Sequence, residues 1–149
     1  MNCTMLAKSN ASIVPRIANL KSSKVNLHVG PGIHYPIDWV LTLKHMPVII
    51  VSEFGQWRRV KICDGTIGWI HKSLLSCKKK AILLNDAVLF SSDSEGSKKL
   101  AQIGKNVVVE IIKRKDIWTK IIVETDDKDK FTGYVKTRSL WGCCADDIK

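Results

Sequence analysis

The chain has 149 residues, a length that suits one medium-sized domain or two small β modules. Its hydrophobic content of 45% is enough for a packed core, and no stretch approaches the length of a transmembrane helix. The 24 Lys and Arg residues outnumber the 14 Asp and Glu residues, for a net charge of +10. This balance keeps a protein soluble and favours anionic partners, whether nucleic acid, a membrane surface or an acidic wall polymer. These values exclude a bundle of transmembrane helices within this sequence.

The five cysteines do not form a metal-binding pattern. An odd number cannot all pair within one chain, and no Cys-x-x-Cys spacing indicates zinc. One disulfide, Cys77 with a cysteine of the tail, is a candidate in an oxidising compartment. The cysteines are Cys3, Cys63, Cys77, Cys143 and Cys144.

Residues 1–18 are predicted to form a mobile N-terminal arm. They contain charged residues and a proline and lack a continuous apolar h-region, so no signal peptide is predicted within them. Cys3 has no lipobox before it, which argues against a lipoprotein. The chain is therefore either cytoplasmic or exported by a signal that lies upstream of Met1 or has been removed.

A β pattern begins after this arm. Residues 19–27 are predicted to form a strand with Val25 and Leu27 on one face, and the break at residues 30–32 (Gly-Pro-Gly) ends it. The glycines lack the wider spacing and the following Lys-Ser/Thr of a phosphate-binding loop, which favours a tight turn. Residues 48–51 (Val-Ile-Ile-Val) are typical of a short buried strand.

The clearest element is a β-hairpin over residues 57–70. Asp64-Gly65 is a strong turn signal because glycine accepts the positive φ of hairpin turns. Strand alternation places Val60 and Ile62 on one face and Trp57, Arg59 and Lys61 on the other. The hairpin displays aromatic side chains and carries no obvious catalytic group, which indicates a binding fold.

The pattern restarts after Lys78-Lys79-Lys80. The second half has no Gly-Pro-Gly element and a longer acidic loop, so we interpret it as a degenerate copy, with residues 98–103 forming a turn at most. Residues 107–112 correspond to residues 47–51. Single positions that correspond are Trp118 to Trp57, Ile121 to Val60, Gly133 to Gly68, Tyr134 to Trp69 and Leu140 to Leu75.

Catalysis has little support. The four histidines (His28, His34, His45 and His71) fall on different predicted elements without the spacing of metal ligands. A Cys63–His71 nucleophile pair is conceivable near one hairpin, but nothing in the sequence would orient the base. We therefore predict no enzyme activity, no metal and no cofactor.

An ordered set of motifs over residues 25–76 resembles the bacterial SH3-like family, and most closely its uncharacterised alphaproteobacterial branch. The resemblance implies a small, twisted, partly open β-barrel that binds protein, peptide or cell wall, often in secreted or periplasmic proteins, without catalysis. Two positions depart from the family: His28 replaces its usual Arg, and Met46 its common Gly. The motifs are Asn26-Leu27-x-Val29-Gly30-Pro31-Gly32, Tyr35-Pro36, Pro47-Val48, Trp57-Arg58-Arg59-Val60, Asp64-Gly65-Thr66, Gly68-Trp69-Ile70-His71 and Ser73-Leu74-Leu75.

We therefore predict an all-β protein of two tandem small SH3-like β-barrels, the second degenerate. Barrel one is assigned to residues 19–77 and barrel two to residues 83–142, with a linker at residues 78–82 and a tail at residues 143–149. Modules this small bury a low fraction of their surface. We expect the two to pack together, with Leu140, Trp141 and the linker at the seam.

The candidate ligand-binding residues form an aromatic and cationic groove on the first module: Tyr35, Trp39, Trp57, Arg59 and Trp69. Trp57 and Trp69 also match barrel positions of the family, where a role in the core or rim is the alternative. Such a groove suits a short, extended, carboxylate-rich peptide such as a peptidoglycan stem peptide.

The expected partner is thus a peptidoglycan peptide or an envelope protein, in the periplasm or cell envelope, or otherwise in the cytoplasm. Two alternatives remain. A basic β-barrel can bind single-stranded nucleic acid by stacking bases on aromatic side chains, although no RRM-type signature is present. A scaffold or assembly module could bind another protein through an exposed barrel edge.

Overall fold

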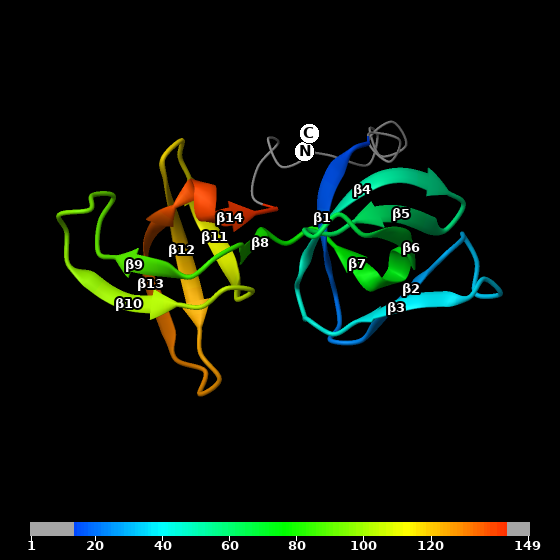
Figure 1. Ribbon diagram of the computed structural model, residues 1–149, viewed down its shortest axis with the longest axis horizontal. Coiled ribbons are helices and arrows are strands. Elements are labelled where there is room, and N and C mark those ends of the chain that lie inside the picture. Colours follow the sequence, from blue (N-terminus) through cyan, green and yellow to red (C-terminus); the bar gives the residue numbers. More distant parts are fainter. Residues whose placement is uncertain (1–13, 143–149) are drawn as a thin grey trace, which may run out of the picture.

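The computed structural model describes residues 14–142 and confirms the all-β prediction (Figure 1). The first antiparallel sheet has the order β3-β2-β6-β5-β4-β1-β7. Its strands are β1 (Arg16–Leu20), β2 (Val25–His28), β3 (Ile37–Leu41), β4 (Pro47–Phe54), β5 (Trp57–Lys61), β6 (Ile67–His71) and β7 (Leu75–Ser76). A single 3-10 turn, η1 (Lys72–Leu74), precedes the last strand.

The second sheet repeats this topology strand for strand, in the order β10-β9-β13-β12-β11-β8-β14. Its strands are β8 (Lys80–Leu83), β9 (Ala87–Phe90), β10 (Lys99–Ile103), β11 (Val108–Arg114), β12 (Trp118–Glu124), β13 (Lys130–Lys136) and β14 (Leu140–Trp141). The 3-10 turn η2 (Thr137–Ser139) again precedes the last strand. The predicted tandem repeat is confirmed, and Figure 1 shows the two modules side by side along the longest axis.

The hairpin of β5 and β6 forms around the predicted Asp64-Gly65 turn. Gly65 has φ 91°, and its amide donates to the carbonyl of Ile62 at 2.9 Å. The amide of Thr66 donates to the Asp64 carboxylate at 2.9 Å, and this bond lowers the pKa of Asp64. Val60 and Ile62 are buried while Arg59 is exposed, so the predicted alternation is confirmed.

One glycine in each module permits the sheet to fold over its own core. A Cβ atom at Gly68 would lie 2.4 Å from Cγ of Leu27, and a Cβ at Gly133 would lie 2.6 Å from Cγ of Leu89. Both leucines are fully buried. The glycine-aromatic pairs of the sequence thus mark the place where a strand must pass close to a core leucine.

The two modules pack against each other. Ile82 of β8 belongs to the core of the first module, and Val108 and Trp141 pack against that core. Leu140, which was expected at the seam, lies instead in the core of the second module. A Cβ at Gly142 would lie 2.4 Å from Cβ of Pro47, which shows how closely the end of the second module approaches β4.

Several segments differ from the prediction. Lys98–Ile103, expected to form a turn at most, is mostly strand β10, because its backbone pairs with β9. Residues 16–18 of the predicted arm lie in β1, and residues 80–82 of the predicted linker lie in β8. The rest of the arm before residue 14, and the tail, lie outside the described residues.

In the part of the chain that the structure describes, Cys63 and Cys77 are free thiols, and the tail cysteines that were candidate partners of Cys77 lie outside this part. Among residues 14–142, no helix is long and apolar enough to cross a bilayer.

Candidate ligand-binding face

The outward face of the first sheet carries a group of aromatic and basic side chains. Alternation along β5 directs Trp57 and Arg59 to this face. Antiparallel pairing then places Trp69 directly opposite Arg59 and His71 directly opposite Trp57. His28 of β2 pairs with Trp69 from the other side. We call these five residues the aromatic face.

Trp57 is held edge-on between two histidines. Its ring centroid lies 5.3 Å from that of His28 and 5.4 Å from that of His71, with interplanar angles of 83° and 87°. Edge-to-face contacts of this kind stabilise by about 0.5–1.5 kcal/mol beyond the buried area. The three rings restrain one another, so Trp57 is a fixed part of the surface.

His28 also fixes the loop that follows β2. It is 7% exposed, and its Nδ1 lies 2.8 Å from the carbonyl oxygen of Tyr35. Since a carbonyl only accepts, Nδ1 of His28 is the donor. The Tyr35 ring covers Gly30, where a Cβ would lie 2.4 Å from Cδ1 of the tyrosine. The Gly-Pro-Gly turn therefore positions Tyr35 beside the aromatic face.

His71 is oriented by its own backbone. Its Nδ1 accepts a hydrogen bond from the Ser73 amide at 3.2 Å and lies 2.8 Å from Oγ of Ser73. The imidazole thereby caps η1.

The two arginines of β5 have different roles. Arg58 and Arg16 both bind the Glu53 carboxylate, at 2.9 Å and 2.7 Å. Arg59 is exposed and makes no ion pair with any residue in the described part of the chain. Its guanidinium is therefore available to a carboxylate of a ligand, which it can bind through two parallel hydrogen bonds.

Trp39 lies apart from the other candidates. Its register partner is the buried Leu27, so its side chain belongs to the opposite side of the sheet from His28 and Trp69. It is nonetheless 58% exposed, because β3 is the edge strand. The structure thus groups Trp57, Arg59 and Trp69 with Tyr35 nearby, and places Trp39 on the rim.

The segment around Trp39 exposes an unusual amount of apolar surface. Six large apolar side chains from Val29, directly before the Gly-Pro-Gly turn, to the end of β3 are exposed: Val29, Ile33, Tyr35, Ile37, Trp39 and Val40. Contiguous exposed apolar residues commonly mark an interaction site. This apolar edge borders the aromatic face through the pairing of Ile37 with His28.

Sequence reasoning missed two members of the aromatic face, His28 and His71. His71 could have been found by counting cross-strand partners outward from the Asp64-Gly65 turn, since this register places it opposite Trp57. His28 gives no such local signal, because it reaches Trp69 only through pairing between β2 and β6.

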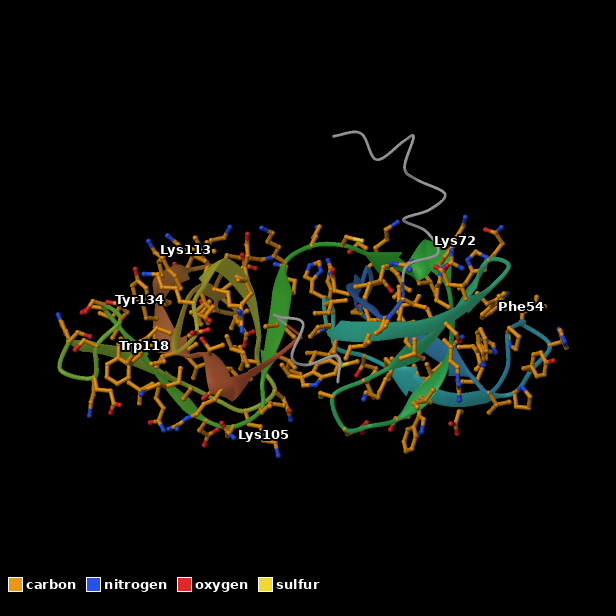
Figure 2. The ribbon with its side chains drawn as sticks, turned by 90° about the horizontal axis from the view of Figure 1, so that it is seen from above. Phe54, Lys72, Lys105, Lys113, Trp118 and Tyr134 are labelled. Carbon is orange, nitrogen blue, oxygen red and sulfur yellow. The ribbon has the colours of Figure 1, made fainter. Side chains whose placement is uncertain are left out.

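The second module has an equivalent face with different chemistry. Phe90 contacts Trp118 edge-on at 5.4 Å, as His28 contacts Trp57. Nζ of Lys136 lies 4.8 Å above the Trp118 ring and 2.7 Å from the Glu95 carboxylate. The hydrogen bond from Lys136 lowers the pKa of Glu95. Figure 2 shows Trp118 and Tyr134 near one end of the molecule. Phe54, which pairs with Trp57 in the first sheet, lies near the other end.

The conceivable Cys63–His71 pair is not formed. Cys63 follows the turn end of β5, whereas His71 pairs with Trp57 at the opposite end, so the whole of β5, about 13 Å long, lies between them. Burial, followed by the neighbouring Asp64, raises the pKa of the Cys63 thiol, which disfavours a thiolate. Within the described residues, no group of three or more His, Cys, Asp and Glu side chains could hold a metal ion.

The two modules of seven short antiparallel strands in the same order have the architecture of SH3-like domains. The chain belongs to the bacterial SH3 domain family, which matches it twice, over residues 21–76 and over residues 85–142. The resemblance inferred from the motifs is thus confirmed at the level of the family. No protein with a curated description matches the chain.

Solved structures that are similar to the chain include NlpC2 and NlpC1 from Trichomonas vaginalis and an NlpC/P60 family protein from Bacillus cereus. Sequence identity is 18%, 17% and 13%, and the TM-scores are 0.37, 0.36 and 0.39. The matches cover 85%, 85% and 83% of this chain, and 48%, 45% and 55% of those chains. The chain therefore spans about half the length of these proteins.

Proposed function

We propose that this protein is a non-catalytic binding module that recognises a cell-wall peptide, or a partner protein of the cell envelope, through the aromatic face of its first module. Bacterial SH3 domains are typically cell-wall binding modules. The observation that carries the proposal is the pairing of Arg59, exposed and without an ion pair among the described residues, with Trp69 beside the restrained ring of Trp57.

This arrangement matches the chemistry of a short extended peptide that bears carboxylates. A guanidinium fork binds a carboxylate in bidentate fashion, and rigid aromatic side chains supply contact area at a low entropic cost. Tyr35 and the apolar edge extend the surface beyond Arg59 and would contact the apolar parts of the ligand. Trp39 would contribute from the rim.

The second module is proposed to bind more weakly or to support the first. Lys120 occupies the position of Arg59, and a lysine lacks the planar fork. The face of the Trp118 ring is occupied by Lys136, which Glu95 holds in place. A ligand would have to displace this ion pair before it could stack on the tryptophan.

Titration of purified muropeptides tests the proposal. Arg59→Ala should weaken binding about tenfold or more, because hydrogen bonds to charged groups contribute about 1.5–3 kcal/mol. The matched control is Lys120→Ala, the same position in the second module, which should change affinity by less than about twofold. Arg59→Ala should leave the free energy of unfolding within about 0.5 kcal/mol of wild type, since the residue is exposed.

Two results would contradict the proposal. The first is the absence of saturable muropeptide binding by the wild-type protein. The second is binding of single-stranded DNA to the aromatic face, with a steep salt dependence that Arg59→Ala abolishes, which would assign this face to nucleic acid instead. Trp57→Ala is a poorer probe, because loss of a large packed ring costs about 3–5 kcal/mol and confuses folding with binding.

A further inference from the structure

Two basic runs that are distant in the sequence meet where the linker enters the second module. Residues 78–80 lead into the start of β8, and residues 113–115 lie at the end of β11 and directly after it. The two strands are paired, and the Ile111 amide donates to the carbonyl of Lys79 at 2.9 Å. The fold thereby concentrates positive charge at the seam between the modules.

A cavity of about 290 Å³ lies at this place. Its walls include Ile17 of the first module, the linker residues Cys77–Lys80, and Ile111, Ile112 and Arg114 of β11. All four of its charged lining residues, which are Lys78, Lys79, Lys80 and Arg114, are cations. The remaining wall is largely aliphatic and contains no aromatic side chain.

Several of these cations are not neutralised within the described residues. Lys80 is 3.8 Å from the Glu110 carboxylate, and Lys115 is 3.6 Å from that of Asp93. Lys78, Lys79 and Lys113 make no ion pair with any residue in the range 14–142. All three side chains are exposed.

A histidine of the first module lies within the same positive field. His45 lies in the turn before β4, and its pKa is lowered by burial and then by Lys80, Lys78 and Lys44. Two of these three lysines line the seam cavity. The field of the linker lysines thus extends to the surface of the first module.

The basic surface continues onto the first module. An adjoining hollow of about 140 Å³ shares Cys77 with the seam cavity and is lined by Lys72 and Arg58. Two of its lining cations, Arg16 and Arg58, bind the Glu53 carboxylate. Figure 2 shows Lys72 and Lys113 on the same side of the molecule, with the linker between them, while Lys105 lies on the opposite side.

We propose that this basic track, defined as Lys72, Lys78, Lys79 and Lys113, binds a linear phosphate-bearing polymer that lacks aromatic bases. The track runs across both modules, which fits a chain of anionic groups better than a single small anion. The aliphatic wall offers no ring on which a base could stack, and stacking supplies much of the affinity for single-stranded nucleic acid. The site is separate from the aromatic face and goes beyond the function proposed above.

Binding of inorganic polyphosphate of defined length to the full chain tests this inference. Lys78→Gln/Lys79→Gln should weaken binding about thirtyfold, because each lysine near an anionic surface contributes about fivefold to the affinity. The slope of log K against log salt should become shallower by between one and two. Lys98→Gln/Lys99→Gln is the matched control, since it removes the same charge from two exposed lysines near β10 and should change affinity less than about twofold.

The exposed thiol of Cys77 gives a readout of location, because it lines both hollows. Bound polyphosphate should slow its alkylation by neutral iodoacetamide at least about threefold, as measured on the Cys77 peptide by mass spectrometry. The half-buried Cys63 serves as the internal reference and should be unaffected. Arg59→Ala should leave this protection unchanged. The polyphosphate experiment can therefore fail without contradicting the function proposed for the aromatic face, and the muropeptide experiment can fail without contradicting the basic track.

Three results would overturn the inference. Equal weakening by the two double variants would show that only diffuse net charge attracts the polymer. Oligothymidylate that binds more than about tenfold more tightly than polyphosphate of equal charge would assign the track to nucleic acid. Binding to anionic lipid vesicles without protection of Cys77 by polyphosphate would assign it to a membrane surface.

Discussion

At the scale of single residues, the binding face depends on contacts that restrain otherwise mobile rings. His28 and His71 flank Trp57, and the Tyr35 carbonyl and the Ser73 amide in turn orient the two imidazoles. A tryptophan restrained in this way loses little conformational entropy when a ligand binds. The same positions in the second module are filled by other side chains, so one backbone arrangement supports two different surfaces.

Gly68→Ala tests the close approach between β6 and the core. The added Cβ would lie 2.4 Å from Cγ of Leu27, which is fully buried and cannot move away freely. Such overpacking should lower the free energy of unfolding by about 1–3 kcal/mol, and Gly133→Ala should do the same through Leu89. Urea denaturation gives the values. Gly96→Ala, whose Cβ meets nothing closer than 3.7 Å, should stay within about 0.5 kcal/mol of wild type.

His45 should make stability depend on pH. Burial and the neighbouring Lys80, Lys78 and Lys44 lower its pKa below the ordinary value of 6.5. The unfolded chain therefore takes up a proton at a higher pH than the folded protein does. The folded protein is therefore favoured while His45 is neutral. The stability that neutral His45 contributes should be fully present above pH 6.5 and decrease as the pH falls through the window between 6.5 and the lowered pKa.

His45→Asn should remove this dependence and leave the turn intact, because asparagine tolerates the left-handed backbone at this position (φ 66°). The unfolding free energies of variant and wild type are measured by urea denaturation from pH 5 to pH 8. Their difference should be constant above pH 6.5. Below pH 6.5 the wild type should lose stability relative to the variant. A difference that does not change with pH would refute the assignment.

At the scale of elements, local pattern predicts strands better than it predicts the site. Alternation over residues 57–62 suffices to place Arg59 outward, because one side chain in two must face the core. Trp39 cannot be placed in this way. The pairing of β2 with β3 shifts register between Leu27 and His28, and a shift of one residue moves the side chains of a strand to the other side of the sheet. The side on which Trp39 lies therefore depends on this shift.

Strand β10 was missed for a related reason. Lys99 and Gln102 interrupt the apolar residues of this five-residue strand, so it lacks the apolar run of a buried strand. Its pairing with β9 at the edge of the second sheet decides its conformation. Only the complete tandem repeat, in which β10 corresponds to β3, could have indicated a strand there.

The two edge strands should differ in their tendency to associate. β3 exposes Ile37, Trp39 and Val40, whereas β10 begins with Lys99, and a lysine on an edge strand blocks pairing with another chain. Val40→Lys should therefore reduce self-association at high protein concentration, as measured by light scattering, and leave the free energy of unfolding nearly unchanged. Leu100→Lys on β10 is the control and should have little effect. A wild-type protein that stays monomeric throughout would contradict this expectation.

At the scale of the whole molecule, the two modules share a strand that is buried on both sides. Ala81, Ile82 and Leu83 of β8 are all nearly inaccessible, unlike the alternating pattern of a strand with one solvent-facing side. Leu83 packs in the core of the second module, and its neighbour Ile82 packs in the core of the first. The second module therefore completes the core of the first.

Substitutions at these neighbouring positions should separate the two cores. Ile82→Ala and Leu83→Ala each remove buried methyl groups and should each cost about 2–5 kcal/mol, but in different modules. Native-state hydrogen exchange locates the effect, because amide protection reports local unfolding free energy. Ile82→Ala should reduce protection in β4 and β5, where the first core lies, and Leu83→Ala should reduce it mainly in β11 and β12. If both variants lowered protection only in the second module, the first module would be stable without its neighbour, and the shared core would have no energetic role.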